Sequence, residues 1–466
     1  MSDKLKADSI GLWGLIFIAM GSLAPIAIFA GAITGASATA LGETTLSFIV
    51  AMFAALFAGN TIFQYSKKIA GASGYYGYVN AGLGKHPAVF TAYLYVLYAV
   101  FNISFLILIY SWAFSGSINL ILGTSLPNAV GVIFVLAVTL LSFFVVYRGL
   151  RPSALALSIL GIIQIAIVVV VSAIFISKVP SPTLTPFTIQ KNPGLTGLFL
   201  GVVTGSYLSY AGYGTVVALG EEAKAPKRTV GRAVIFVILI ATAYYVLGSY
   251  STTSLWGLNN MSNFASSGYP GAILAKEYIG VGVAAIIILL YNFVMFTPVV
   301  AFLNSVSRVM YAMGRDGILP ARFQRLHPKL ATPTFSLWFI LGLIAATTII
   351  LGGIFYALYG FSNGLFDAWL FAAIVTTVST LIIHGMVNVS LGFSAKKWPD
   401  RNVFYHYVAP AISTIIILVV LYYSAVGLPS PIYLAPIVVV VYSLILITLM
   451  YARRASYSKV EIRRGE

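Results

Sequence analysis

The sequence contains no cysteine and very few charged residues. Without cysteine, the 466-residue chain can form no disulfide bond, no thiolate metal site and no cysteine nucleophile. Charged residues make up 8% of the chain, whereas soluble domains carry roughly 25%. Hydrophobic residues make up 60% instead. This composition excludes a water-soluble fold.

The sequence also lacks the residue patterns of a metalloenzyme. Its four histidines, His86, His327, His384 and His406, are all predicted at or near the cytoplasmic face, and they have no metal-ligand spacing. We therefore expect no enzyme activity, no metal and no cofactor, apart from a proton or sodium ion that could couple transport. We expect no nucleic acid partner either, because the net charge of +16 is spread over many separate segments.

The hydrophobic residues fall in runs of roughly 20, the length of a helix that crosses a bilayer. Because the bilayer core contains no water, each run must satisfy its own backbone hydrogen bonds, which predicts helices. The first run is too long for a signal peptide and has no cleavage site before polar sequence. The sequence predicts an all-α membrane protein of about twelve helices, over residues 10–36, 45–66, 88–114, 128–147, 153–176, 194–220, 232–255, 279–308, 334–354, 362–385, 405–425 and 430–452.

Lysine and arginine are distributed unequally over the loops between these helices. If the amino terminus is cytoplasmic, only Lys178, Lys191 and Lys276 fall on the outer side. The positive-inside rule therefore predicts that both termini are cytoplasmic. We expect a multi-pass protein of the cell membrane, whose partners are the lipid bilayer and a small-molecule substrate. The sequence does not indicate an oligomeric state.

Two of the predicted helices are interrupted near their middle. The first contains Gly21 and Pro25, and proline removes a backbone donor and clashes with the preceding turn. The sixth contains Gly212 and Gly214. Either interruption alone favours close packing or a mild kink. Together they occupy corresponding places in two halves of five helices, which is typical of transporters with inverted repeats. Such breaks expose amides and carbonyls that can bind the carboxylate and the ammonium of a zwitterion.

Three loop motifs resemble those of the amino acid-polyamine-organocation transporter superfamily. They are GASGYYGY at 71–78, EEAKAPKR at 221–228 and SRVMYAMGRDGILP at 307–320, the last followed by HPK at 327–329 and TP at 332–333. We expect the motifs to be structural, with the charged residues of 221–228 pairing or capping locally.

The resemblance implies a leucine-transporter-like fold with a five-plus-five inverted repeat, broken first and sixth helices, and alternating access. In this chain the transporter domain would cover residues 1–453, with repeats at 10–176 and 194–385 and two peripheral helices at 405–452. Residues 454–466 would form a short cytoplasmic tail.

The resemblance also implies a substrate site at the two breaks. The first-helix motif of the family, Gly-Ser-Gly followed by an aliphatic residue and Phe, corresponds here to PIAIF at 25–29, which departs from it at Pro25. Since proline suits the first position of a helix, Pro25 would begin an outer half-helix and leave the amides of Ile26 and Ala27 free for a carboxylate. Carbonyls would accept the ammonium, namely those of Leu23, Leu208 and Ala211. The full set of expected substrate-binding residues is Gly21, Leu23, Pro25, Ile26, Ala27, Asn102, Leu208, Tyr210, Ala211, Gly212 and Asn292.

Few residues are available to couple transport to an ion. Proton-coupled relatives use a lysine in the fifth helix, and the corresponding residue here is Gln164, whose amide does not titrate and more commonly bonds between helices. Thr297 could help to bind sodium, although a hydroxyl bonded to its own helix is commoner. Asp367 could gate the outer entrance, attract an amine, carry a proton or remain solvated. Tyr207 and Tyr213 would gate the site or fill the helix interface.

These features predict a secondary transporter for amino acids, coupled to an ion gradient or to exchange. A pocket formed by Ile26, Ala27, Leu208 and Tyr210 would favour uncharged side chains. A transporter of polyamines or other organic amines is the alternative, although the scarcity of acidic residues within the membrane disfavours polycations. A nutrient sensor with the same fold that does not transport is a further alternative.

Overall fold

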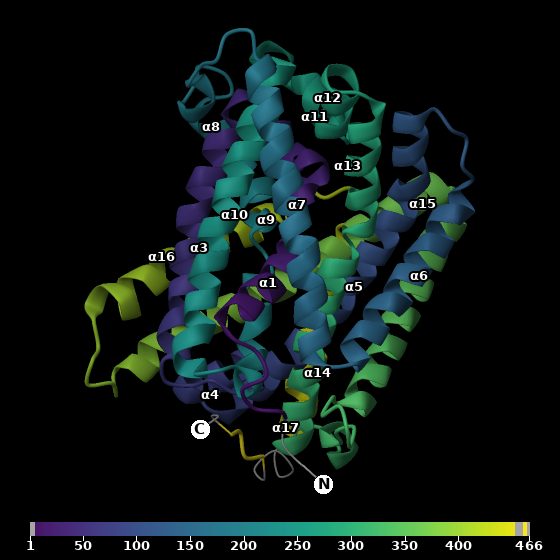
Figure 1. The fold of residues 1–466 in the computed structure, drawn as a ribbon. Coiled ribbons are helices and arrows are strands. Elements are labelled where there is room, and N and C mark those ends of the chain that lie inside the picture. The colour runs from purple at the N-terminus through teal and green to yellow at the C-terminus, as the bar shows by residue number, and fades with distance from the viewer. Residues whose placement is uncertain (1–4, 453–459, 464–466) are drawn as a thin grey trace.

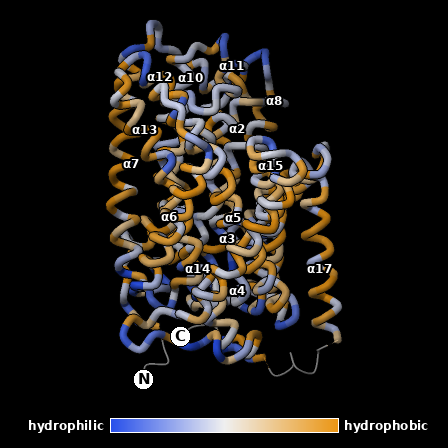
Figure 2. The backbone as a smooth tube through the Cα atoms, turned by 90° about the vertical axis from the view of Figure 1, so that its right-hand side faces the viewer, coloured by the Kyte–Doolittle hydropathy of each residue, from blue (hydrophilic) through white to orange (hydrophobic). Residues whose placement is uncertain are grey.

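The computed structural model describes residues 5–452 and 460–463, which form a bundle of helices (Figure 1). Within these residues the only β-structure is an isolated bridge between Ile10 and Ala223, and ten helices are long and apolar enough to cross a membrane. Figure 2 shows hydrophobic residues along the middle of the molecule and hydrophilic residues gathered at its two ends. This is the distribution expected when lipid surrounds the middle, and the all-helical prediction is confirmed. Of the predicted tail, residues 454–459 and 464–466 lie outside the described part.

The first half of the chain contains the first five predicted spans. Its helices pack as a bundle in which α1 contacts α7. One short helix, α4, lies in the first predicted cytoplasmic loop and is additional to the predicted spans. The elements are α1 (Leu12–Leu23), η1 (Pro25–Phe29), α2 (Gly31–Ala40), η2 (Leu41–Glu43), α3 (Thr44–Ser66), α4 (Tyr75–Leu83), α5 (Lys85–Leu122), α6 (Asn128–Tyr147), α7 (Leu150–Lys178) and η3 (Thr185–Phe187).

The second half contains the remaining predicted spans. The predicted span at 279–308 is divided into α13 and α14, and α11 and α12 lie in the loop before it. The elements are α8 (Gly194–Gly201), η4 (Val202–Ser206), α9 (Tyr207–Ser209), η5 (Tyr213–Glu222), α10 (Pro226–Trp256), η6 (Leu258–Asn260), α11 (Met261–Ser266), α12 (Pro270–Tyr278), α13 (Val281–Phe293), α14 (Phe296–Arg315), η7 (Ala321–Gln324), α15 (Thr334–Ala395), η8 (Phe404–Val408), α16 (Ala409–Tyr423) and α17 (Leu434–Ala452).

The long element α15 is a hairpin of two helices rather than one rod. Gly360 interrupts it with a φ of 76° and a ψ of −175°. The rings of Phe355 and Phe371 lie 5.8 Å apart, whereas a straight helix would separate these residues by about 24 Å. The ninth and tenth predicted helices are therefore the two arms of this hairpin. Counted in this way, the elements follow the order of the predicted spans, while the twelve-pass crossing and the inverted repeat stay predictions.

Both predicted helix interruptions are present, and they meet inside the bundle. Helix α1 ends at Leu23, and Ala24 has a left-handed conformation with a φ of 50° before η1 begins at Pro25. In the sixth predicted helix, residues 194–220, which we call the sixth segment, α9 ends at Ser209 and Gly212 has a φ of 110°. The hydroxyl of Ser22 donates a hydrogen bond of 2.8 Å to the carbonyl of Gly212. This bond ties the first break directly to the second.

The two ends of the described chain lie at the same end of the molecule. The amides of Ser9 and Ile10 donate to the carbonyl of Glu222, at 2.8 and 3.2 Å, and the amide of Glu461 donates to the carbonyl of Asp316 at 3.2 Å. These partners belong to two neighbouring loop motifs. The side of the membrane on which this end lies stays a prediction.

Candidate functional site

The broken sixth segment and α15 enclose two small adjoining cavities beside the break at Gly212. Their volumes are about 30 and about 10 Å³, and both are lined by Gly212, Thr380 and His384. Together they have room for about two water molecules, so an amino acid can enter only if side chains or helices move. The larger cavity is also lined by Tyr207, Leu208, Ala211, Tyr213 and Leu381, and the smaller by Tyr75, Tyr95, Tyr98, Gly214, Thr215 and Phe302.

Aromatic side chains close the cavities on the side of the loop motifs. We call Tyr75, Tyr95, Tyr98 and Phe302 the inner aromatic cluster. The rings of Tyr75 and Tyr95 are 5.8 Å apart, and those of Tyr98 and Phe302 are 5.6 Å apart. A Cβ at Gly214 would fall 1.6 Å from the hydroxyl oxygen of Tyr75. A side chain at this position would therefore displace the ring of Tyr75.

A second aromatic cluster lies beyond the first break. The outer aromatic cluster consists of Tyr110 from α5, Tyr269 just before α12, and Tyr291 from α13, with ring centroids 5.4 Å apart for Tyr110 and Tyr291 and 5.7 Å apart for Tyr269 and Tyr291. A Cβ at Gly31, the first residue of α2, would lie 3.4 Å from the hydroxyl of Tyr291. The inner aromatic cluster therefore lines the smaller cavity, and the outer aromatic cluster packs near the start of α2, just after the first break.

His384 is a cavity residue that the sequence interpretation missed, as are Thr380, Tyr95, Tyr98 and Phe302. The ring of His384 packs edge-on against Tyr75, at 5.2 Å, and Tyr213, at 5.8 Å. Within the described residues, neither ring nitrogen has a hydrogen bond to another group. The sequence signal is an isolated ionisable residue, because no other ionisable side chain occurs between Asp367 and Lys396. Such residues inside a membrane are functional candidates. This signal was overlooked because the predicted helix ended at residue 385, so the histidine was assigned to the cytoplasmic face.

The two backbone amides predicted to bind a carboxylate are both engaged. Pro25 does begin a new helical segment, η1. However, the amide of Ile26 donates to Oε1 of Gln164 at 3.3 Å, and the amide of Ala27 donates to the carbonyl of Ala24 at 2.9 Å. The expectation of free amides is therefore wrong for this conformation. The side chain of Gln164 bonds between helices, which is the commoner role for such an amide.

Two of the three predicted carbonyl ligands, those of Leu23 and Leu208, also have partners. The hydroxyl of Tyr245 donates to the carbonyl of Leu23 at 3.2 Å and to that of Ser209 at 2.6 Å, so it bridges the two breaks. The carbonyl of Leu208 accepts from the amide of Ala211 at 2.9 Å. The hydroxyl of Tyr210 donates to the carbonyl of Phe48 on α3. The side chain of Tyr210 therefore fills a helix interface.

The other predicted site residues line neither cavity. Asn292 donates to the hydroxyl of Ser117 at 2.9 Å, and Thr297 donates to the carbonyl of Val294 in its own chain segment at 3.0 Å. Asn102 is buried, and its Oδ1 has no hydrogen bond. A Cβ at Gly21 would touch Leu157 and the Thr297 carbonyl, and Asp367 is half-buried. Of the pocket predicted from Ile26, Ala27, Leu208 and Tyr210, only Leu208 lines a cavity.

The three loop motifs form one charged network at the end of the bundle. Arg308 pairs with Glu222 at 2.8 Å, and these side chains are 0% and 4% exposed. Arg315 pairs with Glu221 at 2.8 Å and with Asp316 at 3.2 Å. The predicted local pairing within 221–228 is wrong for Glu221 and Glu222, because the end of η5 meets the end of α14.

The first loop motif completes this network. The hydroxyl of Tyr76 donates to Asp316 at 2.8 Å, and the amide of Ala72 donates to Glu221 at 3.0 Å. Burial raises the pKa of the Asp316 carboxyl, although the nearby Arg315 acts in the opposite direction. We call Tyr76, Glu221, Glu222, Arg308, Arg315 and Asp316 the loop-motif network.

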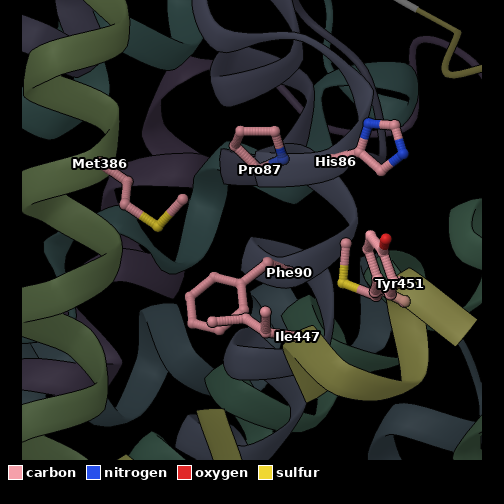
Figure 3. Close-up of a pocket in the computed structure, with 7 residues that line it drawn as sticks. His86, Pro87, Phe90, Met386, Ile447 and Tyr451 are labelled. Atoms are coloured by element: carbon pink, nitrogen blue, oxygen red, sulfur yellow. The ribbon is translucent and has the colours of Figure 1, made fainter. Parts of the chain in front are cut away.

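A larger pocket of about 420 Å³ lies away from the breaks, between α5, α15 and α17 (Figure 3). Apolar side chains dominate its lining, and no residue of either break contributes to it. We therefore do not assign a polar substrate to this pocket. It is lined by His86, Pro87, Phe90, Met386, Ile447, Met450 and Tyr451.

Comparison with known proteins agrees with the loop motifs. The family model described as amino acid permease matches residues 14–461. A branched-chain amino acid permease of Bacillus subtilis is 26% identical over 416 residues, which cover 85% of this chain and 83% of the relative. The methylthioribose transporter of Bacillus subtilis is 26% identical over 357 residues, covering 74% and 75%. Cationic amino acid transporter 7, chloroplastic, of Arabidopsis thaliana is 24% identical over 363 residues, covering 72% and 59%. This chain belongs to the amino acid permease family of the amino acid-polyamine-organocation superfamily of membrane transporters.

Proposed function

We propose that this protein is a secondary transporter that moves neutral amino acids across the cell membrane by alternating access. The family assignment supports amino acid transport. The observation that carries the proposal is the meeting of two helix breaks beside small cavities that are lined largely by aromatic residues. No Asp, Glu, Lys or Arg lines either cavity within the described part of the chain. A charged substrate side chain would find no partner there, so uncharged side chains are favoured.

The cycle that we propose has two alternating openings. For release on the side of the loop motifs, the inner aromatic cluster must separate, and the loop-motif network must loosen or move as a unit. Arg308 and Glu222 join α14 to the end of the broken segment, so their pair couples the two elements that must part. Entry on the other side requires the outer aromatic cluster to separate. An ion gradient or exchange for a second amino acid would drive the cycle.

A second candidate substrate is a small polar solute without a carboxylate. The observation in its favour is that Gln164 and Ala24 occupy the two amides expected to bind a carboxylate. One relative is named a methylthioribose transporter. Polyamines are disfavoured, because the cavities have no acidic side chain among their described lining residues.

Uptake into proteoliposomes tests the proposal. Radiolabelled leucine, isoleucine and valine would be compared with arginine, putrescine and methylthioribose, while the pH gradient, the sodium gradient and the internal amino acid are varied independently. Saturable uptake of the neutral amino acids is expected, with competition among them. Uptake of methylthioribose alone would favour the second candidate. Binding of an amino acid without uptake or exchange under any gradient would indicate a sensor.

A further inference from the structure

We propose that His384 is the proton site of this transporter and that it takes up its proton together with the substrate. This inference rests on the proposed function and names the ion that drives it. Neither the family assignment nor the relatives assign a role to this residue.

The position of His384 distinguishes it from every other titratable group near the cavities. It lines both cavities together with Gly212, the glycine at which the sixth segment is broken. An imidazole is the side chain that changes charge near neutral pH. The other titratable groups that line the cavities are tyrosines, which ordinarily titrate near pH 10. They are Tyr75 from α4, Tyr95 and Tyr98 from α5, Tyr207 from α9 and Tyr213 from η5.

The imidazole also has unused hydrogen-bonding capacity. A histidine with a purely structural role generally bonds through its ring nitrogens, as His406 does when its Nδ1 accepts from the amide of Asn402 at 2.7 Å. His384 is held by ring packing against Tyr75 and Tyr213, and no described residue bonds to its nitrogens. Its nitrogens are therefore free to bind a proton, a water molecule or a substrate group.

The charges around His384 explain how a proton and a substrate would bind together. Within the described residues no carboxylate lines the cavities, so an imidazolium there would have no anionic partner from the protein. A buried charge without a partner is unfavourable. The carboxylate of an amino acid would supply that partner, so each ligand would strengthen the binding of the other. Gln164 on α7 aligns with the lysine of proton-coupled relatives. It cannot take this role, because its amide does not titrate and already bonds to Ile26.

The same geometry gives the proton a route of release. Tyr75 belongs to the inner aromatic cluster and touches the His384 ring directly. When this cluster separates, water reaches the ring at the moment when the substrate leaves. Loss of the substrate carboxylate then removes the partner of the imidazolium, and the proton leaves to water on the same side. Substrate and proton would therefore move in the same direction.

Transport by His384→Gln in proteoliposomes tests the proposal, because glutamine keeps hydrogen bonding but does not titrate. In the wild type, an inwardly directed proton gradient should drive leucine accumulation. In H384Q this accumulation should fall at least about tenfold, and exchange of labelled leucine for internal leucine should fall less, because glutamine still offers the carboxylate a hydrogen-bond donor. The matched control is His86→Gln, at an exposed histidine outside the cavities, which should behave as the wild type. Undiminished proton-driven accumulation by H384Q would overturn the proposal, and so would equal loss of accumulation and exchange.

A second measurement needs no variant and so does not depend on the folding of H384Q. Leucine is added to purified wild-type protein in weakly buffered detergent solution with a pH-sensitive dye. We expect uptake of about one proton per bound leucine, and a leucine Kd that changes by up to about tenfold per pH unit. Leucine binding without proton uptake would overturn the role of His384 while leaving the proposed function intact. A wild type that neither binds nor moves any amino acid would instead contradict the proposed function.

Discussion

Gly212 sits where the two helix breaks touch, and both its conformation and its surroundings exclude a side chain. Its φ is 110°, a region that costs an L-residue about 1–2 kcal/mol. A Cβ there would lie 2.7 Å from the side chain of Ser22. The glycine therefore lets the broken sixth segment pass close to the broken first one. A single residue thus holds together the two breaks on which the proposed site depends.

We expect Gly212→Ala to impair transport more strongly than stability. The added methyl group would push the two breaks apart, so leucine uptake should fall at least about tenfold, while the melting temperature in detergent falls moderately. The control is Gly116→Ala on α5, because a Cβ at Gly116 has no atom within 4 Å. Normal uptake by G212A would show that the breaks tolerate separation.

Arg308→Met should destabilise the protein strongly. Removing one partner of a buried ion pair leaves the other charge uncompensated, which costs about 3–5 kcal/mol. The double variant Arg308→Met, Glu222→Met should recover much of this loss, because no unpaired charge remains. Thermal unfolding in detergent measures both. Lys68→Ala serves as the comparison and should have little effect, since Lys68 and Asp400 are 35% and 59% exposed. Equal losses in the single and double variants would contradict the role of charge.

Asp316 should make stability depend on pH in a defined direction. Burial raises the pKa of this carboxyl above its ordinary 3.8, so the folded protein binds the proton more tightly than the unfolded chain does. The contribution of this carboxyl to the free energy of unfolding is therefore present below pH 3.8 and is lost as the pH rises through the raised pKa. In Asp316→Asn, melting temperatures measured across this range should fall less with pH than in the wild type. Parallel pH profiles for the two proteins would contradict this assignment.

At the scale of elements, the hairpin of α15 depends on the close approach of its two arms. A Cβ at Gly364 would lie 2.4 Å from the carbonyl oxygen of Phe355, and this backbone atom cannot move independently of its helix. The second arm carries Thr380 and His384 into the cavities. A small displacement at the turn would therefore be transmitted to the site.

We expect Gly364→Ala to separate the arms and to lower both the melting temperature and the uptake of leucine. The separation of the arms can be measured by disulfide trapping between cysteine pairs introduced across them, because the chain has no cysteine of its own. Gly353→Ala on the first arm is the matched control, since a Cβ at that position meets no atom within 4 Å. Unchanged stability of G364A would show that the turn can absorb the strain.

The orientation of the whole molecule follows from where the charges lie along the chain. Lys191, between η3 and α8, is predicted outside, and Lys329, between η7 and α15, is predicted inside. In the cysteine-free background, Lys191→Cys should react with a membrane-impermeant maleimide in intact cells, whereas Lys329→Cys should react only after permeabilisation. Both lysines are exposed, so burial does not explain a difference. The opposite labelling would reverse the predicted topology.

The membrane class, the helix breaks and the family can all be predicted from local features of the sequence. The membrane class follows from the length of its apolar runs, and both helix breaks follow from Pro25, Gly212 and Gly214, because helix formation depends on neighbouring residues. The loop motifs indicated the family that the comparisons confirm. In each case the cause lies within a few residues or one helix length.

Only the tertiary structure decided which groups remain available at the site. It pairs Gln164 with the Ile26 amide, Arg308 with Glu222 and Tyr245 with both breaks, across separations of 138, 86 and up to 222 residues. It also brings His384 beside Gly212, within a helix whose sequence alone suggested the cytoplasmic face. Such contacts depend on how distant helices pack, and no local pattern encodes that packing. The sequence by itself therefore determined what kind of protein this is, and the packing of its helices decided which side chains face the cavity.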